Sequence, residues 1–267
     1  MPNLTELSFS EIENIYREYI NLGYPNIKSL EITNCRIDNL RLFFNQFPNL
    51  EYLKIHFKNL HYVSLEIEEL RKKTYSFNLK QLKTLHLINK HASSLLFLFY
   101  NGNPDNYFSP SSLILENCHI TSPSLFHKLT NLKSLTLKDI IVQYKDEEWR
   151  NDEFNTSFLL TKSLSHLEKL HIENCKCLIG SFLSGAYTRK DFCWSSTIFL
   201  TLPALKELFL TKSIINTLDF TIFLGSGNLQ KVGLYSCQEK TKNTPFVTKE
   251  TALNLFKNYP KIELFFN

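Results

Sequence analysis

Six cysteines and eight histidines are the side chains of this chain that are best suited to metal binding, disulfide formation or nucleophilic chemistry. A structural zinc site needs two close ligand pairs, but Cys175-x-Cys177 is the one close pair and Cys193 stands apart. No histidine lies in an H-E-x-x-H motif, and no nucleophile elbow is present. With 7 glycines in all, the chain also lacks a recognisable phosphate-binding loop. We therefore expect no enzyme activity, no metal and no cofactor.

The other cysteines recur at the end of one repeated phrase. The four copies are Thr33-Asn34-Cys35, Glu116-Asn117-Cys118, Glu173-Asn174-Cys175 and Tyr235-Ser236-Cys237. Each closes a unit of the form L-x-x-L-x-L-x-x-C-x-L, in which the cysteine follows a strand and points inward. A small thiol with a weak S–H donor packs well beside a turn. We expect these cysteines to be reduced core residues, which is typical of a cytoplasmic or nuclear protein.

The same template recurs along the chain and predicts about nine strands. The central apolar residues of these strands are Leu30, Leu53, Leu85, Leu113, Leu135, Leu170, Leu208, Val232 and Ile262. Their spacing averages about 29 residues, and segments between them, such as 39–47 and 248–256, have helical spacing. Many of these segments end in a turn such as Phe47-Pro-Asn-Leu50. The sequence therefore predicts an α/β fold, an irregular solenoid of strand–helix repeats with a parallel sheet on the concave face of a horseshoe.

These units resemble the cysteine-containing, ribonuclease-inhibitor-like leucine-rich repeats found in the repeat region of F-box proteins. The resemblance covers the chain from Ile27 to its end and implies a protein-binding role. An F-box is a longer helical module than the segment before Ile27 and usually opens with Leu-Pro, which does not occur there. The resemblance therefore implies the repeat fold without a recognisable F-box.

The two ends of the repeat array predict different caps. Residues 1–26 are expected to form a capping helix, because Ser8 to Glu13 offers overlapping capping boxes before an apolar helical face. Residues 27–267 are expected to form one continuous solenoid domain. The last strand near Phe265 would leave an open apolar edge, so we expect a partner or the preceding helix to cover it.

Composition agrees with a soluble binding protein. The chain has 267 residues, of which 43% are hydrophobic, and 30 Lys+Arg against 26 Asp+Glu give a formal charge of +4. This mild excess does not by itself predict nucleic-acid binding. The longest apolar run, from Leu95 to Tyr100, is far too short for a membrane span, and the first residues do not resemble a signal peptide. We therefore expect no membrane association.

Residues that alternate with the buried strand positions should project from the concave face. The candidate partner-binding residues there are Tyr52, Lys54, His86, Glu116, Lys138, His171, Glu173, Phe209 and Tyr235. Two long inserts add Trp149 and Trp194 as a second candidate surface. The mixture of both charge signs with aromatic anchors favours a protein partner over RNA, which requires a more uniformly basic surface.

We therefore predict a non-catalytic protein–protein interaction scaffold, which would act as a subunit of a larger complex. Two alternatives stay open. The first is a ribonucleoprotein component that contacts RNA, and the second is a part of a ubiquitin ligase that receives substrates. The sequence does not identify the partner.

Overall fold

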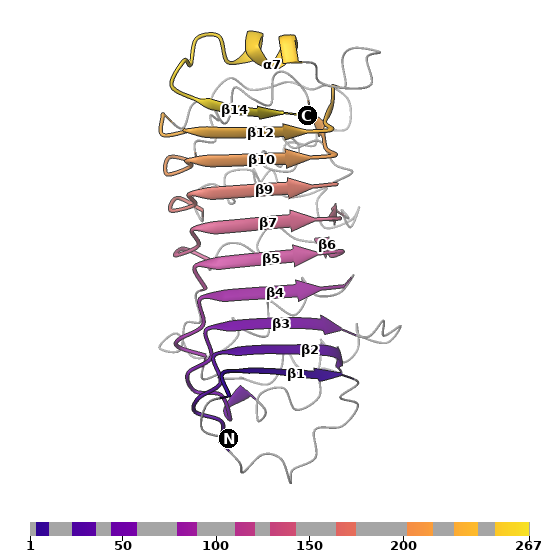
Figure 1. Cartoon of the computed structure of the whole chain (residues 1–267), viewed down its shortest axis with the longest axis vertical. Helices are drawn as coiled ribbons and strands as arrows, with labels where there is room; N and C mark the ends of the chain where they lie inside the picture. The colour runs from indigo at the N-terminus through magenta and orange to yellow at the C-terminus, as the bar shows by residue number, and fades with distance from the viewer. Residues whose placement is uncertain are drawn as a thin grey trace, which may run out of the picture. The chain divides into compact units, whose positions relative to one another are not determined.

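In the computed structural model of the chain, the described residues are 4–10, 23–35, 44–57, 79–89, 110–120, 129–142, 164–174, 202–215, 227–239 and 249–266. They belong to two compact units, Met1–His119 and Ile120–Asn267, each of which is described by itself. Within each unit the main strands are parallel, and each is supplied by a separate repeat (Figure 1). This is the arrangement of leucine-rich repeats, in which every coil adds one strand to a common sheet.

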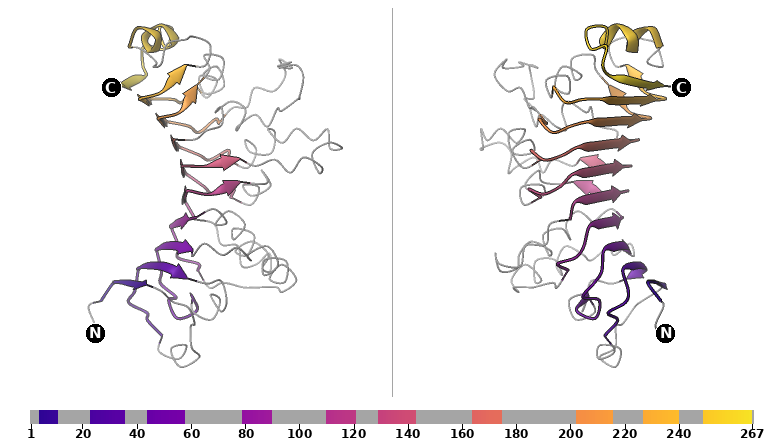
Figure 2. Two further views of the ribbon diagram at one scale, coloured as in Figure 1. Left: turned by 90° about the vertical axis from the view of Figure 1, so that its right-hand side faces the viewer. Right: turned by 60° about the vertical axis from the view of Figure 1, so that its left-hand side comes forward.

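The first unit contains five parallel main strands. They are β1 Glu6–Ser10, β2 Ser29–Cys35, β3 Tyr52–Phe57, β4 Thr84–Ile88 and β5 Ser112–Glu116, paired in that order. The leucines of the template lie in register across all five strands: Leu7, Leu30, Leu53, Leu85 and Leu113. The strands form a single layer (Figure 2).

The second unit repeats this layout. Its main strands, again paired in order, are β7 Ser134–Lys138, β9 Lys169–Glu173, β10 Glu207–Thr211, β12 Lys231–Tyr235 and β14 Glu263–Phe266. Short strands follow several main strands of the chain: β6 His119–Ile120 follows β5 of the first unit, and β8 Ile141–Val142, β11 Ile214–Ile215 and β13 Gln238–Glu239 follow β7, β10 and β12. β11 and β13 pair in parallel with each other.

Burial alternates along the strands as the template requires. In β4, for example, Leu85 and Leu87 are fully buried, while the residues on either side of them are partly exposed. Successive strand side chains point to opposite faces, so the two leucines of each repeat stack on those of the neighbouring repeats. Burying one leucine side chain contributes roughly 1.5–3 kcal/mol. These ladders of apolar side chains form the core that holds each unit together.

A tight turn precedes most of the main strands and places the chain for pairing. The amide of Leu50 donates to the carbonyl of Phe47 at 3.2 Å, and the same contact joins Leu205 to Leu202 at 3.0 Å. Asparagine before the leucine adds a link between repeats, because Asn49 Nδ2 donates to the carbonyl oxygen of Pro25 at 2.9 Å. The turn phrase expected from the sequence is therefore present.

A left-handed residue follows the strands and explains the Asn-Cys phrase. Asn34, Asn117, Asn174 and Ser236 have φ values of 54°, 52°, 49° and 52°. Asparagine tolerates this conformation better than most residues with a β-carbon. The turn directs the next side chain inward, where the Cys118 thiol lies 3.6 Å from the carbonyl oxygen of Leu87 in the preceding repeat.

Replacing the turn asparagine should separate backbone strain from side-chain chemistry. We expect Asn117→Ala to lose about 1–2 kcal/mol of stability, because alanine has no local hydrogen bond with which to offset a positive φ. Asn117→Gly should lose less, since glycine adopts this conformation freely. Urea unfolding followed by circular dichroism measures both. Equal stability of the two variants would contradict this account of the turn.

The structure corrects two strand assignments at the ends of the chain. Glu6–Ser10, expected within a capping helix of residues 1–26, is strand β1, because Leu7 and Phe9 continue the apolar ladders of β2. The remainder of that expected helix, residues 11–22, lies outside the described residues. At the other end, Val232 pairs with Leu264 rather than with Ile262, so the last strand is displaced by two residues from its predicted register.

Helix α7, Lys249–Leu255, is the helix whose bounds fall within the described part of the chain. It occupies the segment expected to be helical before the last strand. Ala252 and Phe256 are buried, whereas Leu253 is 49% exposed. Among the described helical residues, no helix is long and apolar enough to cross a membrane.

Candidate functional site

The strand face opposite the core is the candidate binding surface, and we call it the open face. It carries the partly exposed side chains that alternate with the buried ladders in both units. Because the strands are in register, these side chains also form rows across each sheet. The two units differ in what these rows contain.

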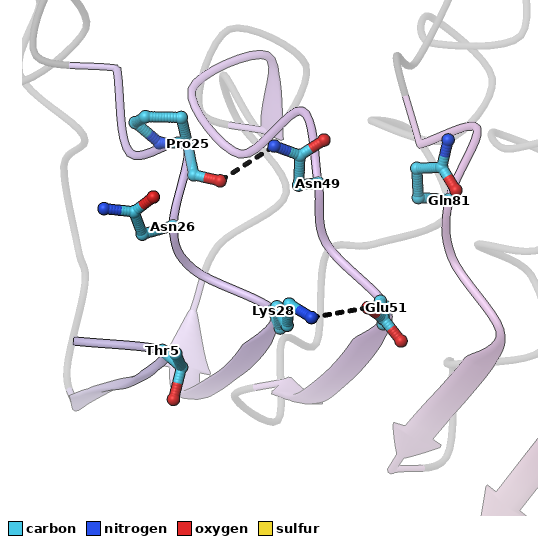
Figure 3. Close-up of a pocket in the computed structure, with 7 residues that line it drawn as sticks. All are labelled: Thr5, Pro25, Asn26, Lys28, Asn49, Glu51 and Gln81. Carbon is cyan, nitrogen blue, oxygen red and sulfur yellow. Dashed lines mark hydrogen bonds and ion pairs between the residues drawn. The ribbon is translucent and has the colours of Figure 1, made fainter. Parts of the chain in front are cut away.

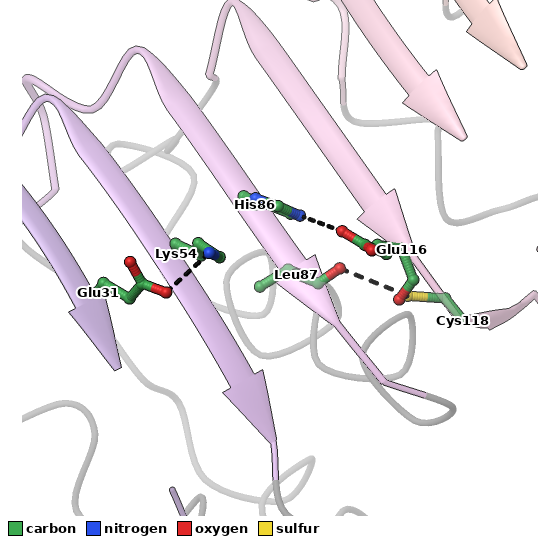
Figure 4. Close-up of polar contacts among 6 residues, drawn as sticks. All are labelled: Glu31, Lys54, His86, Leu87, Glu116 and Cys118. Atoms are coloured by element: carbon green, nitrogen blue, oxygen red, sulfur yellow. Dashed lines mark hydrogen bonds and ion pairs between the residues drawn. The ribbon is translucent and has the colours of Figure 1, made fainter. Parts of the chain in front are cut away.

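In the first unit the open face carries a charged cluster, which consists of Glu31, Lys54, His86 and Glu116 (Figure 4). Lys54 Nζ lies 2.7 Å from Glu31 Oε1 on the neighbouring strand. His86 Nε2 lies 3.2 Å from Glu116 Oε2 on the other side. The hydrogen bond from Lys54 to the Glu31 carboxylate raises the pKa of the lysine amine above its ordinary value. The cluster is thus internally paired.

The histidine of the charged cluster is held neutral. Burial lowers the pKa of His86 below its ordinary value, and the nearby Glu116 carboxylate offsets this only in part. We therefore interpret the His86–Glu116 contact as a hydrogen bond from a neutral imidazole to a carboxylate. Tyr52, on the same face, has its phenol pKa raised mainly by burial.

In the second unit the open face carries an aromatic cluster, which consists of His171, Phe209, Tyr235 and Phe265. Phe209 is its centre: its ring centroid lies 6.3 Å from that of His171, 6.5 Å from Tyr235 and 6.4 Å from Phe265. The His171 ring meets Phe209 edge-on, whereas the Phe209 and Tyr235 rings are parallel within 2°. Both geometries are favourable for aromatic pairs. Four strands, β9, β10, β12 and β14, supply one ring each.

Gly233 allows these rings to come together. It occupies the position on β12 that is in register with Phe209 and Phe265. A β-carbon placed there would lie 2.5 Å from Phe209 Cδ1 and 2.7 Å from Tyr235 Cε2. The rings therefore occupy the volume that any other residue would fill. Glycine weakens a strand, and here neighbouring aromatic rings cover it.

Acid should weaken the fold through these half-buried histidines. Burial lowers the pKa of His171 as well as that of His86, so the unfolded chain binds protons more readily than the folded chain. Stability is then fully present above the ordinary histidine pKa and is lost as the pH falls through the lower, folded values. We expect the double variant His86→Gln/His171→Gln to lose less melting temperature than the wild type between about pH 7.5 and 5.5. An equal loss of melting temperature in the two proteins over this pH range would contradict this.

Charged residues just before the strands form ion-pair ladders in both units. Glu51 lies between Lys28 and Lys83, and Glu168 lies between Lys133 and Lys206. The hydrogen bond from Lys83 is the largest cause of the lowered Glu51 pKa, and that from Lys206 has the same effect on Glu168. The lysines are exposed and the two glutamates are partly exposed, so each of these ion pairs contributes little to stability.

One open pocket of about 570 Å³ lies beside the first of these ladders (Figure 3). Its lining residues are Thr5, Pro25, Asn26, Lys28, Asn49, Glu51 and Gln81. Lys28 Nζ lies 3.3 Å from Glu51 Oε1, and Asn49 donates to the carbonyl oxygen of Pro25, so these polar groups bind one another. We assign no ligand to this pocket.

The structure distributes the predicted binding residues between two separate groups. Tyr52, Lys54, His86 and Glu116 lie in the first unit, and Lys138, His171, Glu173, Phe209 and Tyr235 lie in the second. Trp149 and Trp194 lie outside the described residues. Tyr52 therefore does not belong to the aromatic cluster. Phe265 and Gly233, which face the same side, were not among the predicted binding residues.

The cysteine positions that can be described carry buried thiols. Cys118 and Cys237 are free, and burial raises the pKa of the Cys118 thiol to about 12. Cys237 donates to the carbonyl oxygen of Leu210 at 3.3 Å, the equivalent of the Cys118 contact with Leu87. Cys175, Cys177 and Cys193 lie outside the described residues. Across the described ranges, no three His, Cys, Asp or Glu side chains converge as metal ligands would.

No protein-family model matches the chain, and no curated protein matches it either. Among solved structures, internalin C2 from Listeria monocytogenes is similar to this chain at 20% sequence identity. That match covers 85% of this chain and 79% of the internalin chain, with a TM-score of 0.41. The repeat architecture described above follows from the strand pairing and burial of this chain itself.

Proposed function

We propose that this chain is a non-catalytic scaffold that binds a partner protein through its open face, with the aromatic cluster as the anchor. The observation that carries this proposal is the convergence of Phe209, Tyr235 and Phe265 above Gly233 on a partly exposed surface. Aromatic side chains at the centre of an interface supply most of its binding energy, while the surrounding contacts exclude water. Repeat proteins present extended surfaces of this kind.

The charged cluster supports a role in selecting the partner rather than in chemistry. Its carboxylates and bases are paired at hydrogen-bond distance, and His86 is held neutral. Because these charges are matched within the cluster, the cluster disfavours a partner surface of strongly one-sided charge. Lys54 is already engaged by Glu31, so it does not favour the RNA-binding alternative, and no described feature supports the ubiquitin-ligase alternative.

The test is partner capture that depends on the aromatic cluster. The tagged full chain would be used to isolate binding proteins, and the recovered partner would be quantified against that recovered with variants. We expect Phe209→Ala and Tyr235→Ala each to reduce recovery at least ten-fold, which corresponds to about 1.4 kcal/mol or more of binding energy. Circular dichroism of each variant would show whether it is folded.

The matched control is Tyr52→Ala, which removes an open-face tyrosine from the other unit. Partner recovery with this variant should equal that of the wild type if the aromatic cluster is the anchor. A loss with Tyr52→Ala that equals the loss with Tyr235→Ala would place the anchor elsewhere. Full recovery with both cluster variants would exclude the aromatic cluster from the interface.

We also propose the cysteine-containing subtype of leucine-rich repeat and a cytoplasmic or nuclear location. The buried, unpaired thiols of Cys118 and Cys237 support both, because such thiols are typical of reducing compartments. We expect these two thiols to resist alkylation in the native protein and to react once it is unfolded. Site-resolved mass spectrometry after iodoacetamide treatment would measure this.

A further inference from the structure

We infer that the open face of the second unit docks onto the same surface of a second copy of this chain, with the aromatic cluster at the centre of the contact. This inference rests on the proposed scaffold function and specifies its partner. A row of alternating charges beside the aromatic rings carries it, and the size of the patch sets the expected affinity.

This row, which we call the charged row, crosses the four strands that carry the aromatic cluster (Figure 1). In strand order from β9 through β10 and β12 to β14, its members are Lys169, Glu207, Lys231 and Glu263. Lys169 Nζ lies 3.0 Å from Glu207 Oε2 on the neighbouring strand. The alternation ends at β7, where Ser134 is in register with Lys169.

The first unit differs at the equivalent positions. Its strands β1 to β5 carry Glu6, Ser29, Tyr52, Thr84 and Ser112 there, and only the first of these residues is charged. The alternation of charge therefore belongs to the strands that also supply the aromatic rings. This coincidence links the charged row to the surface that we propose as the anchor.

The charged row is complementary to itself. A two-fold axis parallel to the strands, midway between β10 and β12, sets the row of one copy against the reversed row of the other. Lys169 then faces the second copy's Glu263, and Glu207 faces the second copy's Lys231. Because a two-fold interface repeats each contact, all four charges of each copy meet an opposite charge. An odd number of alternating charges would instead set like charges against each other.

The same orientation brings the aromatic clusters together. The rings lie in the row next to the charged row, two residues further along each strand. Two sheets that pack face to face lie about 10 Å apart, and their side chains interdigitate across this gap. Aromatic residues at the centre and charges beside them are the usual composition of a protein interface. The rings would supply affinity, and the charged row would disfavour orientations that bring like charges together.

The size of the patch predicts a weak, reversible dimer. Four strands about 4.8 Å apart, with three outward positions on each at intervals of about 6.6 Å, cover roughly 400 Å² per copy. A stable interface usually buries about 800 Å² per partner. We therefore expect a dissociation constant of about 10–300 µM, in the range of transient contacts.

The first test is sedimentation velocity of the purified full chain over a series of concentrations up to about 1 mM. We expect the sedimentation coefficient of the wild type to rise with concentration toward that of a dimer. Phe209→Leu should weaken self-association about five-fold or more, because it removes the central ring and keeps an apolar side chain. Tyr52→Ala, on the open face of the other unit, should leave it unchanged. Melting temperatures would show that each variant is folded.

Charge reversal gives the decisive test. Glu207→Lys and Lys231→Glu should each weaken self-association about ten-fold or more, because each sets two pairs of like charges face to face in the dimer. When the two variants are mixed, a heterodimer has opposite charges at all four positions. We therefore expect the mixture to associate with an affinity close to that of the wild type. Such rescue cannot arise from loss of the fold in either variant.

The double variant Glu207→Lys/Lys231→Glu separates contacts between copies from contacts within one sheet. Its row carries two positive charges followed by two negative ones, which again become complementary after the two-fold rotation. We expect this variant to dimerise like the wild type, although each reversed charge now lies beside a like charge in its own sheet. A dimer weaker than that of either single variant would overturn the assigned contacts.

Three further outcomes would overturn the inference. The first is a wild-type chain that stays monomeric at up to about 1 mM. The second is self-association that neither Phe209→Leu nor the single charge reversals weaken, which would place the dimer interface elsewhere. The third is a mixture of the two single variants that associates no better than each variant alone.

These outcomes are distinguishable from failure of the proposed function. If the chain stays monomeric while Phe209→Ala and Tyr235→Ala lose the recovery of a different protein, the scaffold function stands and self-association falls. If the charge variants behave as expected while recovery of other proteins is unchanged by both cluster variants, self-association stands. The aromatic cluster is then excluded as the anchor for those other proteins.

Discussion

Leu85→Ala is expected to destabilise the protein by about 2–5 kcal/mol, the usual cost of removing a buried leucine side chain when the surrounding core cannot collapse. Leu85 lies on β4, between Leu53 of β3 and Leu113 of β5, and all three are fully buried. The cavity would therefore be lined by neighbouring repeats on both sides. In a stacked array each repeat is supported mainly by its neighbours, so the loss weakens two interfaces at once. Urea unfolding of the full chain, followed by circular dichroism, measures this effect.

The matched control for Leu85→Ala is Ile88→Ala, on the opposite face of the same strand. Ile88 is partly exposed on the open face, so its truncation should cost less than about 1 kcal/mol. Both changes replace a branched aliphatic residue of β4 with alanine. The difference between their stability losses therefore reports mainly the burial of the side chain. Similar losses for the two variants would contradict the assignment of the core and open faces.

The strand ladder could be predicted from the sequence because its period is imposed by packing. Two apolar residues separated by one outward residue must recur in every repeat, and only the spacing between repeats is free to vary. β1 was missed although Leu4-x-x-Leu7-x-Phe9 fits the same template. The capping boxes that begin at Ser8 are a local signal, and pairing with β2 outweighs them. The positive φ after each of these strands explains why the repeated phrase has asparagine before the cysteine, a preference that the sequence alone did not explain.

The last strand shows what a period-two pattern leaves undetermined. Ile262-Glu-Leu264 and Leu264-Phe-Phe266 both fit the template, and a displacement of two residues keeps every side chain on its face. Pairing of Leu264 with Val232 fixes the register. The displacement matters for the open face, because it brings Phe265 beside Gly233 and into contact with Phe209.

The candidate site could be predicted only as a set of outward positions. Alternation identifies which side chains face away from the core, but contacts across strands depend on ring size and on diagonal neighbours. Phe209 is in register with Gly233, yet it stacks on Tyr235, two residues further along β12. The sequence feature that could have indicated this cluster is Gly233, a glycine inside a strand whose neighbouring strands carry aromatic residues at the same position. Tyr52 shares the outward pattern, but its register neighbours are Ser29 and Thr84.

Gly233→Ala is expected to disrupt the aromatic cluster and to cost about 1–3 kcal/mol of stability, as overpacking of a well-filled site usually does. The new methyl group would overlap Phe209 Cδ1 and Tyr235 Cε2, so at least one ring must move. Alanine is otherwise the better residue in a strand interior, so a loss of stability would point directly to this overlap. The matched control is Thr136→Ala on the same row in β7, which should change stability by less than about 0.5 kcal/mol.

A second substitution decides whether the overlap with Phe209 is the cause. In the double variant Gly233→Ala/Phe209→Leu the bulky ring is gone, so the methyl group is accommodated and its cost should fall by about 1 kcal/mol or more relative to the single variant. Thermal and urea unfolding of the four proteins in this cycle would give the coupling energy. Additive losses would mean that Gly233 and Phe209 act independently. If glycine is required because it lets Phe209 stack in the cluster, we expect two results. The double variant should regain stability relative to the sum of the single losses, and it should still fail to bind the partner.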